Sequence, residues 1–390
     1  MAASLGLVDR PRSRASIAAL NFATVAVYAD LYIPQPLLPL LSTEFGVRPA
    51  TAGLTISVSV LMIALVSFLY GSLSDSVGRK PVMVSSCLLL ALPTLACAFA
   101  TSFRSLLLFR ALQGLLMPGV TAVAVAYIGD YYSGADLGPR VGGWIAASVA
   151  GGLTGRVLSG FLAAAFDWRA PFVFFGGLTL LGAAAIGRAL PKGTAGESVR
   201  LAEAYRGMFR HFRNRRLVGS FLIGATVFFA FIGVFTYLPY YLTADPFRLS
   251  TALVSSVYLV YVAGVFTSIA IGRIAHRRGS RPVMAAGFLI AIAAVLSTLP
   301  HSLPAIVAAL VVLCVGMFTV QSTAPAFVNA NARGGKGAAG SLYVTFYYVG
   351  ASLGSVLPGY AFQVWGWPGV AAACMGALLV GLVADVWLCA

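Results

Sequence analysis

Residues 71–83 read G-S-L-S-D-S-V-G-R-K-P-V-M, and residues 272–284 repeat this segment as G-R-I-A-H-R-R-G-S-R-P-V-M. Segments 151–168 and 350–367 form a second pair, and each contains three glycines and a tryptophan at matching positions. Both pairs lie in a chain that is almost entirely apolar. Internal repeats of this kind are typical of membrane proteins built from two similar helical bundles. The matched residues of the second pair are Gly151, Gly155, Gly160 and Trp168 with Gly350, Gly354, Gly359 and Trp367.

The composition excludes a soluble protein. Hydrophobic residues make up 59% of the 390 residues and charged residues only 9%, whereas a soluble domain has about 25% charged residues. Apolar runs recur at the length of roughly 20 residues that crosses a bilayer. We therefore predict an all-α membrane protein with twelve transmembrane helices in two pseudo-symmetric six-helix bundles. The predicted spans are 16–42, 50–74, 81–101, 104–127, 141–165, 170–190, 217–241, 250–275, 282–299, 303–328, 340–363 and 367–389.

The connections between the spans divide the chain into domains. Most connections are short, but residues 191–216 are polar and basic and have a helical pattern. We therefore predict an N-terminal six-helix bundle over 1–190, a cytoplasmic basic linker over 191–216 and a C-terminal six-helix bundle over 217–390.

The distribution of charge predicts the orientation. The chain has 26 Lys+Arg against 11 Asp+Glu, a formal net charge of +15. If both termini are cytoplasmic, nearly all basic residues outside the spans fall in cytoplasmic loops, as the positive-inside rule requires. The basic excess therefore indicates contact with the headgroups of a lipid bilayer and argues against a nucleic-acid partner.

Several segments resemble one family. G-S-L-S-D-S-V-G-R-K at 71–80 resembles the loop between helices 2 and 3 of the major facilitator superfamily, and L-F-R-A-L-Q-G at 108–114 resembles its helix-4 motif with a buried arginine. Q-P-L-L-P at 35–39, G-G-L-T-G-R at 151–156 and S-L-Y-V-T-F-Y-Y-V-G at 341–350 are similar to bacterial drug:proton antiporter-type efflux permeases, of the arabinose-efflux or YnfM-like branch. Exporters of the superfamily often have a Gly-Pro step in helix 5, where this chain has Gly155-Arg156.

The two repeated loops are candidate gating motifs. Gly71 and Gly78 permit close helix approach and a tight turn. The resemblance implies that Asp75 and Arg79 join a charge network at the cytoplasmic helix ends, with Asp130 as a further partner. A solvated loop that only obeys the positive-inside rule is the alternative, and it leaves the repeated glycines unexplained. His276 replaces Asp75 in the second copy, so we expect a weaker or pH-sensitive latch there. The candidate gating residues are Gly71, Asp75, Gly78, Arg79, Lys80, Asp130, Gly272, His276, Gly279 and Arg281.

Asp30 and Arg110 are the candidate proton-coupling residues. Asp30 lies inside the first predicted span, and an aspartate at the centre of a bilayer costs about 2.5–3.5 kcal/mol on insertion scales. Desolvation raises the proton affinity of a carboxyl group, and a nearby cation lowers it. The resemblance implies that Arg110 influences proton release from a nearby acid, so we expect the transport cycle to change the distance between Arg110 and Asp30. The alternative role for Asp30 is a structural ion pair or hydrogen bond.

The resemblance also implies a central cavity lined by helices 1, 4, 7 and 10. Aromatic side chains with a few amides suit amphipathic organic molecules or sugars, although tyrosines also occur in interfacial belts. Arg156 has three possible roles: proton coupling, binding of an anionic substrate, or packing with its head bonded to backbone carbonyls. The Gly151/Gly155 and Gly350/Gly354 rows are expected to form the seam between the halves. The candidate cavity residues are Asn21, Tyr28, Tyr32, Gln35, Gln113, Arg156, Tyr237, Gln321 and Asn329, with Tyr240 near an outer rim.

These features predict a secondary active transporter of the bacterial inner membrane. It exports a small organic molecule (drug-like, a sugar or a metabolite) in exchange for protons, by alternating access. A proton-coupled uptake symporter of the same fold is the alternative, and a polytopic enzyme or receptor is a third possibility. The sequence contains no metal, Walker or dinucleotide motif and no clustered catalytic set, so we expect no enzyme activity, no cofactor and no catalytic residues. We expect a monomer, because each chain carries its own pathway.

Overall fold

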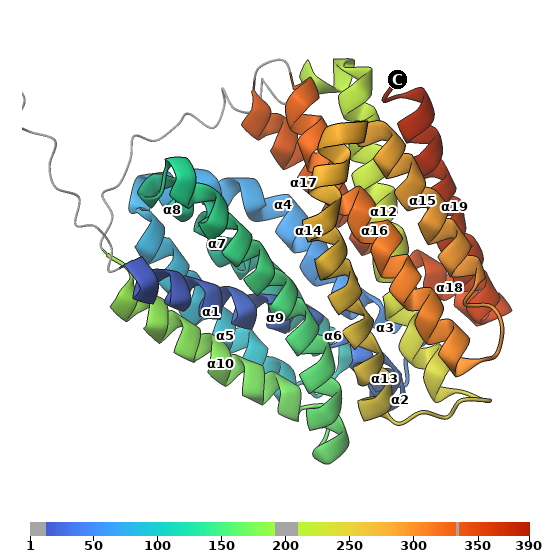
Figure 1. The fold of residues 1–390 in the computed structure, drawn as a ribbon. Helices are drawn as coiled ribbons and strands as arrows, with labels where there is room; N and C mark the ends of the chain where they lie inside the picture. Colours follow the sequence, from blue (N-terminus) through green and yellow to red (C-terminus); the bar gives the residue numbers. More distant parts are fainter. Residues whose placement is uncertain (1–12, 192–209, 333–334) are drawn as a thin grey trace, which may run out of the picture.

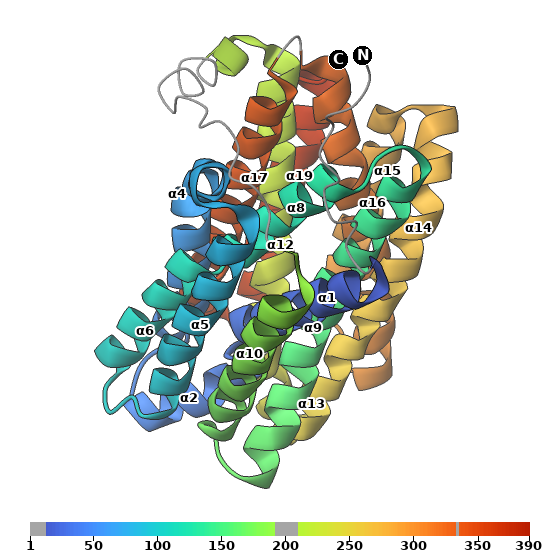
Figure 2. The same cartoon turned by 90° about the vertical axis from the view of Figure 1, so that its left-hand side faces the viewer.

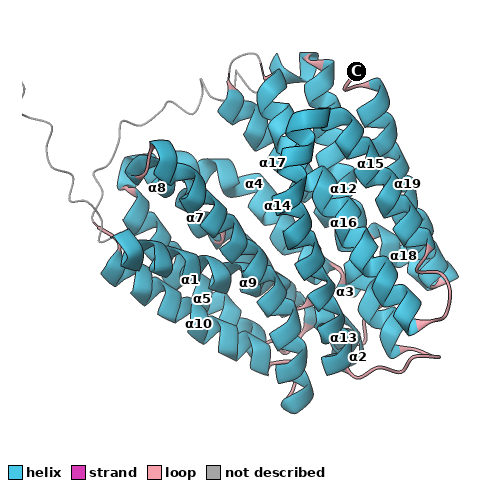
Figure 3. Cartoon of the chain, in the orientation of Figure 1, coloured by secondary structure: helices cyan, strands magenta, loops and turns pink. Residues whose placement is uncertain are grey.

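The computed structural model describes residues 13–191, 210–332 and 335–390. All regular elements in these ranges are helices, and they form two groups that lean against each other (Figure 1 and Figure 3). The predicted linker over 191–216 is described only at Pro191 and from Arg210 onward. Its remaining residues lie outside the described part of the chain.

The first group contains six spans, three of which are interrupted. In Figure 2 this group faces the viewer, with α10, α5 and α1 in front. Two of the interruptions involve proline, because proline lacks the N–H that continues a helix: Pro34 and Pro36 separate α1 from α2, and Pro118 begins α7. The third lies at Gly53, between α3 and α4. The elements are α1 (Ser13–Tyr32), η1 (Gln35–Leu37), α2 (Leu38–Phe45), α3 (Pro49–Ala52), α4 (Leu54–Val77), α5 (Arg79–Ala98), α6 (Phe103–Leu116), α7 (Pro118–Thr121), α8 (Val123–Tyr131), η2 (Gly134–Asp136), α9 (Leu137–Ala165) and α10 (Ala170–Ala189).

The second group repeats this arrangement. Pro358 lies at the start of α18 and marks a break in the eleventh span, whereas Pro239 and Pro325 lie inside the unbroken helices α12 and α16. The elements are η3 (His211–Arg213), α12 (Arg215–Thr243), α13 (Thr251–Val257), η4 (Tyr258–Val260), α14 (Tyr261–Arg278), α15 (Ser280–Leu296), α16 (Leu303–Asn331), α17 (Lys336–Gly354), α18 (Leu357–Trp365) and α19 (Trp367–Trp387).

Twelve spans are present in the described residues. Ten helical stretches are long and apolar enough to cross a membrane, α15 is a shorter apolar helix, and α17 with α18 forms the remaining, interrupted span. The predicted fold class of twelve helices in two six-helix bundles is therefore confirmed. Several helices extend beyond the predicted spans at their polar ends, as α4 does to Val77 and α14 to Arg278, because hydropathy marks the apolar core of a helix and not its end.

The repeated loops end the second span of each half in the same way. Gly78 and Gly279 have φ values of 101° and 86°, which residues with a side chain rarely adopt. Glycine therefore recurs at this position because both loops adopt a backbone conformation with positive φ. The predicted close helix approach at Gly71 is wrong for this conformation, because Gly71 has open space where a Cβ atom would lie, and so has its counterpart Gly272.

The two ends of the molecule differ. We call the end that carries Arg79, Arg215 and Arg281 the basic face, and the other end, with the turns near Gly46 and Gly366, the opposite face; the basic face is at the top of Figure 1. The halves are joined by hydrogen bonds on the side of the opposite face. Ser42 Oγ lies 2.6 Å from Tyr240 Oη, Gln35 donates to Thr236 Oγ1 at 3.1 Å, and Ser57 Oγ lies 2.7 Å from Ser352 Oγ.

The glycine rows lie inside each half, so the expectation that they form the seam between the halves is wrong. Gly151 and Gly155 of α9 pack against the backbone of α1, and Gly350 and Gly354 of α17 pack against the backbone of α12. Each row brings the fifth helix of its half against the first. Other glycines form the seam: Gly160 lies against Ser255, and Gly53 lies against the carbonyl of Ser355.

Candidate functional site

The candidate site is a cavity of about 390 Å³ between the two halves. Its lining comes from α1, α9, α12, α14, α16 and α17. A neighbouring hollow of about 460 Å³ shares Tyr28, Trp144, Val344 and Tyr348 with it and continues past Ser67 and Gly337 toward the basic face. The hydrogen bonds described above close the other side. Among the described residues, the path therefore leads from the centre of the molecule toward the basic face and is closed toward the opposite face.

The cavity walls are mainly aromatic. The ring of Phe228 on α12 stacks on that of Tyr347 on α17, with 3.7 Å between centroids, and Gln321 on α16 donates to Tyr347 Oη at 2.6 Å. Three buried polar atoms of the lining have no hydrogen-bond partner within the described residues: Trp144 Nε1, Tyr261 Oη and Tyr343 Oη. Buried polar groups are nearly always paired in native proteins, so these three atoms indicate space for a polar ligand or water.

Arg156 lies at the closed end of the cavity. Its side chain is 2% exposed, and its guanidinium carbon lies 3.6 Å from the ring centroid of Tyr32 and 4.7 Å from that of Tyr261. Its Nη1 donates to the carbonyl of Gly152 at 2.8 Å, and its Nε donates to Gln35 Oε1 at 2.5 Å. Gln35 in turn donates to Thr236 of the other half. Arg156 therefore connects the cavity with the contact that closes its far side.

Asp30 lies inside the first half and does not line the cavity. Its carboxyl group is fully buried, and Oδ2 accepts from Thr179 Oγ1 at 2.8 Å and lies 3.2 Å from Thr94 Oγ1. Oδ1 has no hydrogen-bond partner within the described residues. Thr94 also accepts from Gln113 at 2.7 Å, and Gln113 accepts from Arg110 at 2.6 Å. A polar chain thus connects Asp30 on α1 to Arg110 on α6 through Thr94 on α5 and Gln113 on α6.

Arg110 forms no ion pair with the Asp30 carboxylate in this conformation. Its guanidinium group donates to the main-chain carbonyls of Asp30 at 3.0 Å, Leu31 at 2.7 Å and Thr55 at 2.8 Å. Pro34 explains the first of these bonds, because residue 34 would otherwise donate the helical hydrogen bond to the Asp30 carbonyl and proline has no N–H. Arg110 therefore terminates α1 where the prolines interrupt the first span.

The gating residues of the first copy gather at the basic face. Arg79 lies between two carboxylates, 2.6 Å from Asp75 and 2.9 Å from Asp130, and Lys80 donates to the carbonyl of Leu190 at 2.5 Å. These contacts tie α4, α5, α8 and the end of α10 together. They lie within the first half and do not reach the second.

The second copy has a different arrangement. His276 is exposed, and neither His276 nor Arg281 takes part in an ion pair within the described residues. Arg281 donates to the carbonyl of Val386 on α19 at 3.2 Å. The replacement of Asp75 by His276 thus removes the carboxylate that binds the loop arginine in the first copy.

Four of the nine candidate cavity residues line the cavity: Tyr28, Tyr32, Arg156 and Gln321. The other five do not. Gln35 lies behind Arg156, Gln113 belongs to the chain near Asp30, and Tyr237 donates to the carbonyl of Ser355 at 2.7 Å. Asn21 lies beside Gly143 and Asn329 is exposed near the basic end of α16. Tyr240 is bonded to Ser42 in the closed contact between the halves.

The predicted set of lining helices differs from the observed one. Helices 5, 8 and 11 contribute residues that sequence reasoning missed, and helix 4 reaches only the neighbouring hollow. One signal for helix 11 was available, because the Y-V-T-F-Y-Y run at 343–348 places aromatic residues on several faces of one helix. The missed lining residues include Trp144, Phe228, Phe231, Tyr261, Phe318, Tyr343 and Tyr347.

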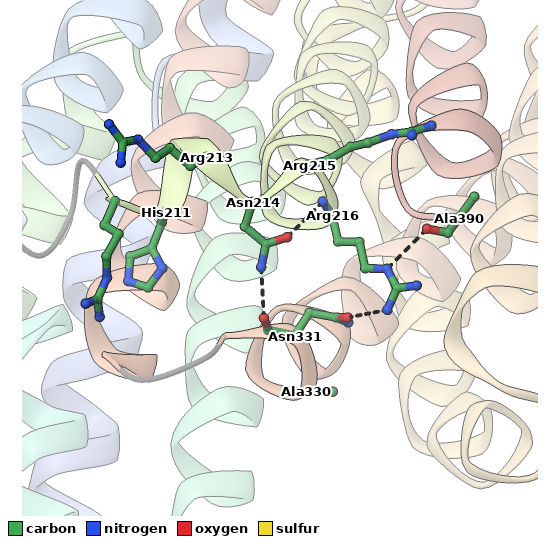
Figure 4. A pocket seen from close by; sticks show the side chains of 9 residues that line it. His211, Arg213, Asn214, Arg215, Arg216, Ala330, Asn331 and Ala390 are labelled. Atoms are coloured by element: carbon green, nitrogen blue, oxygen red, sulfur yellow. Dashed lines mark hydrogen bonds between the residues drawn. The ribbon is translucent and has the colours of Figure 1, made fainter.

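A larger hollow of about 730 Å³ lies at the basic face, at the start of α12 (Figure 4). Asn214 donates to the carbonyl of Asn331 at 3.1 Å, and Arg216 donates to a main-chain oxygen of Ala390 at 3.1 Å. The hollow belongs to the second half alone. Because it does not lie between the halves, it is not the candidate transport site. Its basic lining residues are Arg210, His211, Arg213, Arg215 and Arg216.

Two six-helix bundles around one central cavity define a polytopic membrane transporter. The sequence matches the Major Facilitator Superfamily over residues 20–355, and the chain belongs to this superfamily. The predicted family is thereby confirmed, and the protein is a multi-pass membrane protein.

Relatives and solved structures agree with this assignment. The inner membrane transport protein YnfM of Escherichia coli (strain K12) is 34% identical over 94% of this chain and 88% of its own length. The uncharacterized MFS-type transporter YybF of Bacillus subtilis (strain 168) is 32% identical over 93% of this chain and 89% of its own length. A bacterial homologue of the human lysosomal transporter Spinster, solved in an inward-facing and unoccupied conformation, has a TM-score of 0.75 at 18% identity, covering 96% of this chain and 94% of that one. The nucleoside transporter NupG has a TM-score of 0.78 at 14% identity, covering 96% and 98%.

Proposed function

We propose that this protein is a secondary active transporter of the bacterial inner membrane that exports a small organic molecule in exchange for protons. The observation that carries the proposal is the cavity between the halves, which is closed toward the opposite face and continues through the neighbouring hollow toward the basic face. A second conformation closed at the basic face completes an alternating-access cycle. Each chain encloses its own cavity, which supports transport by a monomer.

The basic face is the cytoplasmic face in this proposal, and both termini are cytoplasmic. Support comes from the positions of Arg79, Lys80, Arg215 and Arg216, which lie at one end of the molecule, since cytoplasmic loops of membrane proteins carry the excess of Lys and Arg. The cavity then opens to the cytoplasm, where an exporter collects its substrate. The ion pairs of Arg79 act as part of the cytoplasmic gate by holding the ends of α4, α5 and α8 as one body.

Asp30 is the proposed proton carrier. Its buried carboxyl group is connected to Arg110 through Thr94 and Gln113, and no cation among the described residues pairs with it in this conformation. Ionisable groups inside transmembrane segments usually have such a role in transporters. Movement of Arg110 toward the carboxylate in the other conformation provides the coupling, because a nearby cation favours the ionised form.

Purified protein in liposomes with a luminal pH-sensitive dye tests the function. Addition of compounds from a metabolite and drug panel on the side of the basic face is expected to move protons in the direction opposite to one of them. Protons moving with the compound indicate the uptake symporter. If none of the compounds is transported, or the transported compound moves without protons, the proposal of proton-coupled export is wrong.

Gly160→Val tests alternating access. A Cβ atom at Gly160 overlaps Ser255 of the other half, and overpacking of this kind costs about 1–3 kcal/mol. The variant is therefore expected to favour the conformation open at the opposite face by about 5- to 150-fold. Thr43 and Ala244 are exposed on opposite halves. Spin labels at Thr43→Cys and Ala244→Cys are therefore expected to be farther apart in the variant, as measured by double electron–electron resonance.

Gly142→Val is the matched control for this prediction. Gly142 lies on the same helix, α9, but has open space where a Cβ atom would be. The control is expected to keep the label distances of the parent protein. Equal distances in the Gly160→Val and Gly142→Val proteins would show that the Gly160–Ser255 contact does not set the equilibrium.

A further inference from the structure

The cavity contains a cation without a matching anion. The chain has 11 Asp and Glu residues, of which Asp9, Glu197 and Glu203 lie outside the described part. Of the remaining eight, none lines the cavity. Five form ion pairs elsewhere, namely Glu44, Asp75, Asp130, Asp167 and Asp245, and the others are Asp30 inside the first half, Asp136 in an exposed turn and Asp385 on α19.

The contacts of Arg156 are all with neutral groups. Gln35 and the carbonyl of Gly152 accept from its guanidinium group, and the rings of Tyr32, Tyr258 and Tyr261 surround it. A buried charge is normally paired with an opposite charge, because desolvation without a counter-ion is costly. Arginine is also the side chain that best matches the two oxygens of a carboxylate.

The unpaired polar atoms of the cavity also favour an anionic ligand. The buried Trp144 Nε1, Tyr261 Oη and Tyr343 Oη line this cavity without partners in the described residues. All three can donate hydrogen bonds to an anion. The remaining wall consists largely of rings such as those of Phe228, Phe231 and Phe318, which favour an aromatic or apolar body.

We infer that the cavity binds an organic anion, with a carboxylate against Arg156 and an aromatic or apolar body between the rings of the two halves. This inference rests on the proposal that the cavity is the transport site. Binding of the anion also affects the contact between the halves. The anion competes with Gln35 for Arg156, and Gln35 is hydrogen-bonded to Thr236 of the other half. The substrate thus acts on the hydrogen bond that helps to close the opposite face.

Calorimetric titration of the full-length protein in lipid nanodiscs tests the inference with three probes that share a phenylpropyl skeleton: 3-phenylpropanoate, its isosteric amide 3-phenylpropanamide, and 3-phenylpropylamine. The anion is expected to bind at least about tenfold more tightly than the neutral amide, because a charge-assisted pair is stronger than a neutral hydrogen bond. The cationic amine is expected to bind most weakly.

Two variants assign the preference to Arg156. Arg156→Gln is expected to weaken binding of the anion about tenfold or more and to leave binding of the amide within about threefold. Gln35→Glu retains the arginine and places a carboxylate at its Nε, so the internal ion pair is expected to abolish the preference for the anion. Arg169→Gln is the control, because Arg169 pairs with Glu44 outside the cavity. Size-exclusion profiles and thermal unfolding verify that each variant is folded.

The outcomes separate this inference from the proposed function. Equal affinity for anion and amide in the parent protein, an unchanged preference in both the Arg156→Gln and Gln35→Glu proteins, or no binding of any probe would overturn the inference. Proton exchange in liposomes is measured independently. A protein that exchanges protons for a neutral compound overturns only the anion preference, whereas one that binds the anion but moves no protons overturns only the proposed exchange.

Discussion

Asp30→Asn is expected to reduce transport driven by a pH gradient to the level of protein-free liposomes. Asparagine has the size of aspartate and can still form hydrogen bonds with Thr94 and Thr179, but its amide group cannot take up and release a proton during transport. Exchange of substrate across the membrane without a gradient is expected to continue, because Asp30 does not line the cavity. Measurement of both rates on the same liposomes separates coupling from substrate movement.

Asp385→Asn is the matched control for Asp30. Asp385 is the other carboxyl group with almost no exposure in the described residues, at 1%, but it lies on α19 near the basic face. This variant is expected to keep its coupling. If Asp30→Asn retains pH-driven transport, Asp30 has no part in the mechanism and its burial is structural.

Arg110→Leu is expected to lower the free energy of unfolding by about 2–6 kcal/mol, since a buried polar group left without its partner costs about 1–3 kcal/mol and at least two carbonyls at the end of α1 lose theirs. The Asp30 carbonyl is the most sensitive, because Pro34 cannot replace the lost donor. Reversible denaturation in mixed micelles measures the change. Arg110→Lys, which keeps one charged donor, is expected to lie between the parent protein and the leucine variant.

Arg104→Leu provides the comparison on the same helix. Arg104 is exposed near the start of α6, and exposed substitutions usually change stability by less than about 0.5 kcal/mol. If the two leucine variants were equally stable, the bonds from Arg110 to α1 would contribute nothing and its role would have to be sought in transport alone.

The fold could be predicted because two of its determinants are local. Apolar runs of bilayer length identify spans, and the paired loops at 71–83 and 272–284 identify the duplication. Gly78 and Gly279 were recognisable as turn residues because a positive φ excludes most other residue types at that position. Twelve spans in two halves follow from such signals without any knowledge of how the helices pack.

The site was less predictable because packing between the halves is not local. A glycine row shows that a helix approaches another backbone closely, but it does not identify the partner, and Gly155 faces Ala29 of its own half. Gln113 is polar and lies inside a span, but its face of α6 turns toward Thr94 and not toward the cavity. Arg110 was expected to change its distance from Asp30 during the transport cycle, and the bond of its guanidinium group to the Asp30 carbonyl became visible only in the structure.

The two bundles share a backbone arrangement but differ in their charged residues near the centre of the molecule. Asp30, Arg110 and Arg156 all belong to the first bundle, whereas the second bundle contributes uncharged rings and one amide to the cavity. In the proposed function, the residues for proton coupling therefore lie in the first bundle alone, whereas the residues that contact the substrate come from both bundles. If the proposed function holds, substitutions of the aromatic residues in the second bundle change which substrate is bound and leave the proposed proton-coupling residues of the first bundle unchanged.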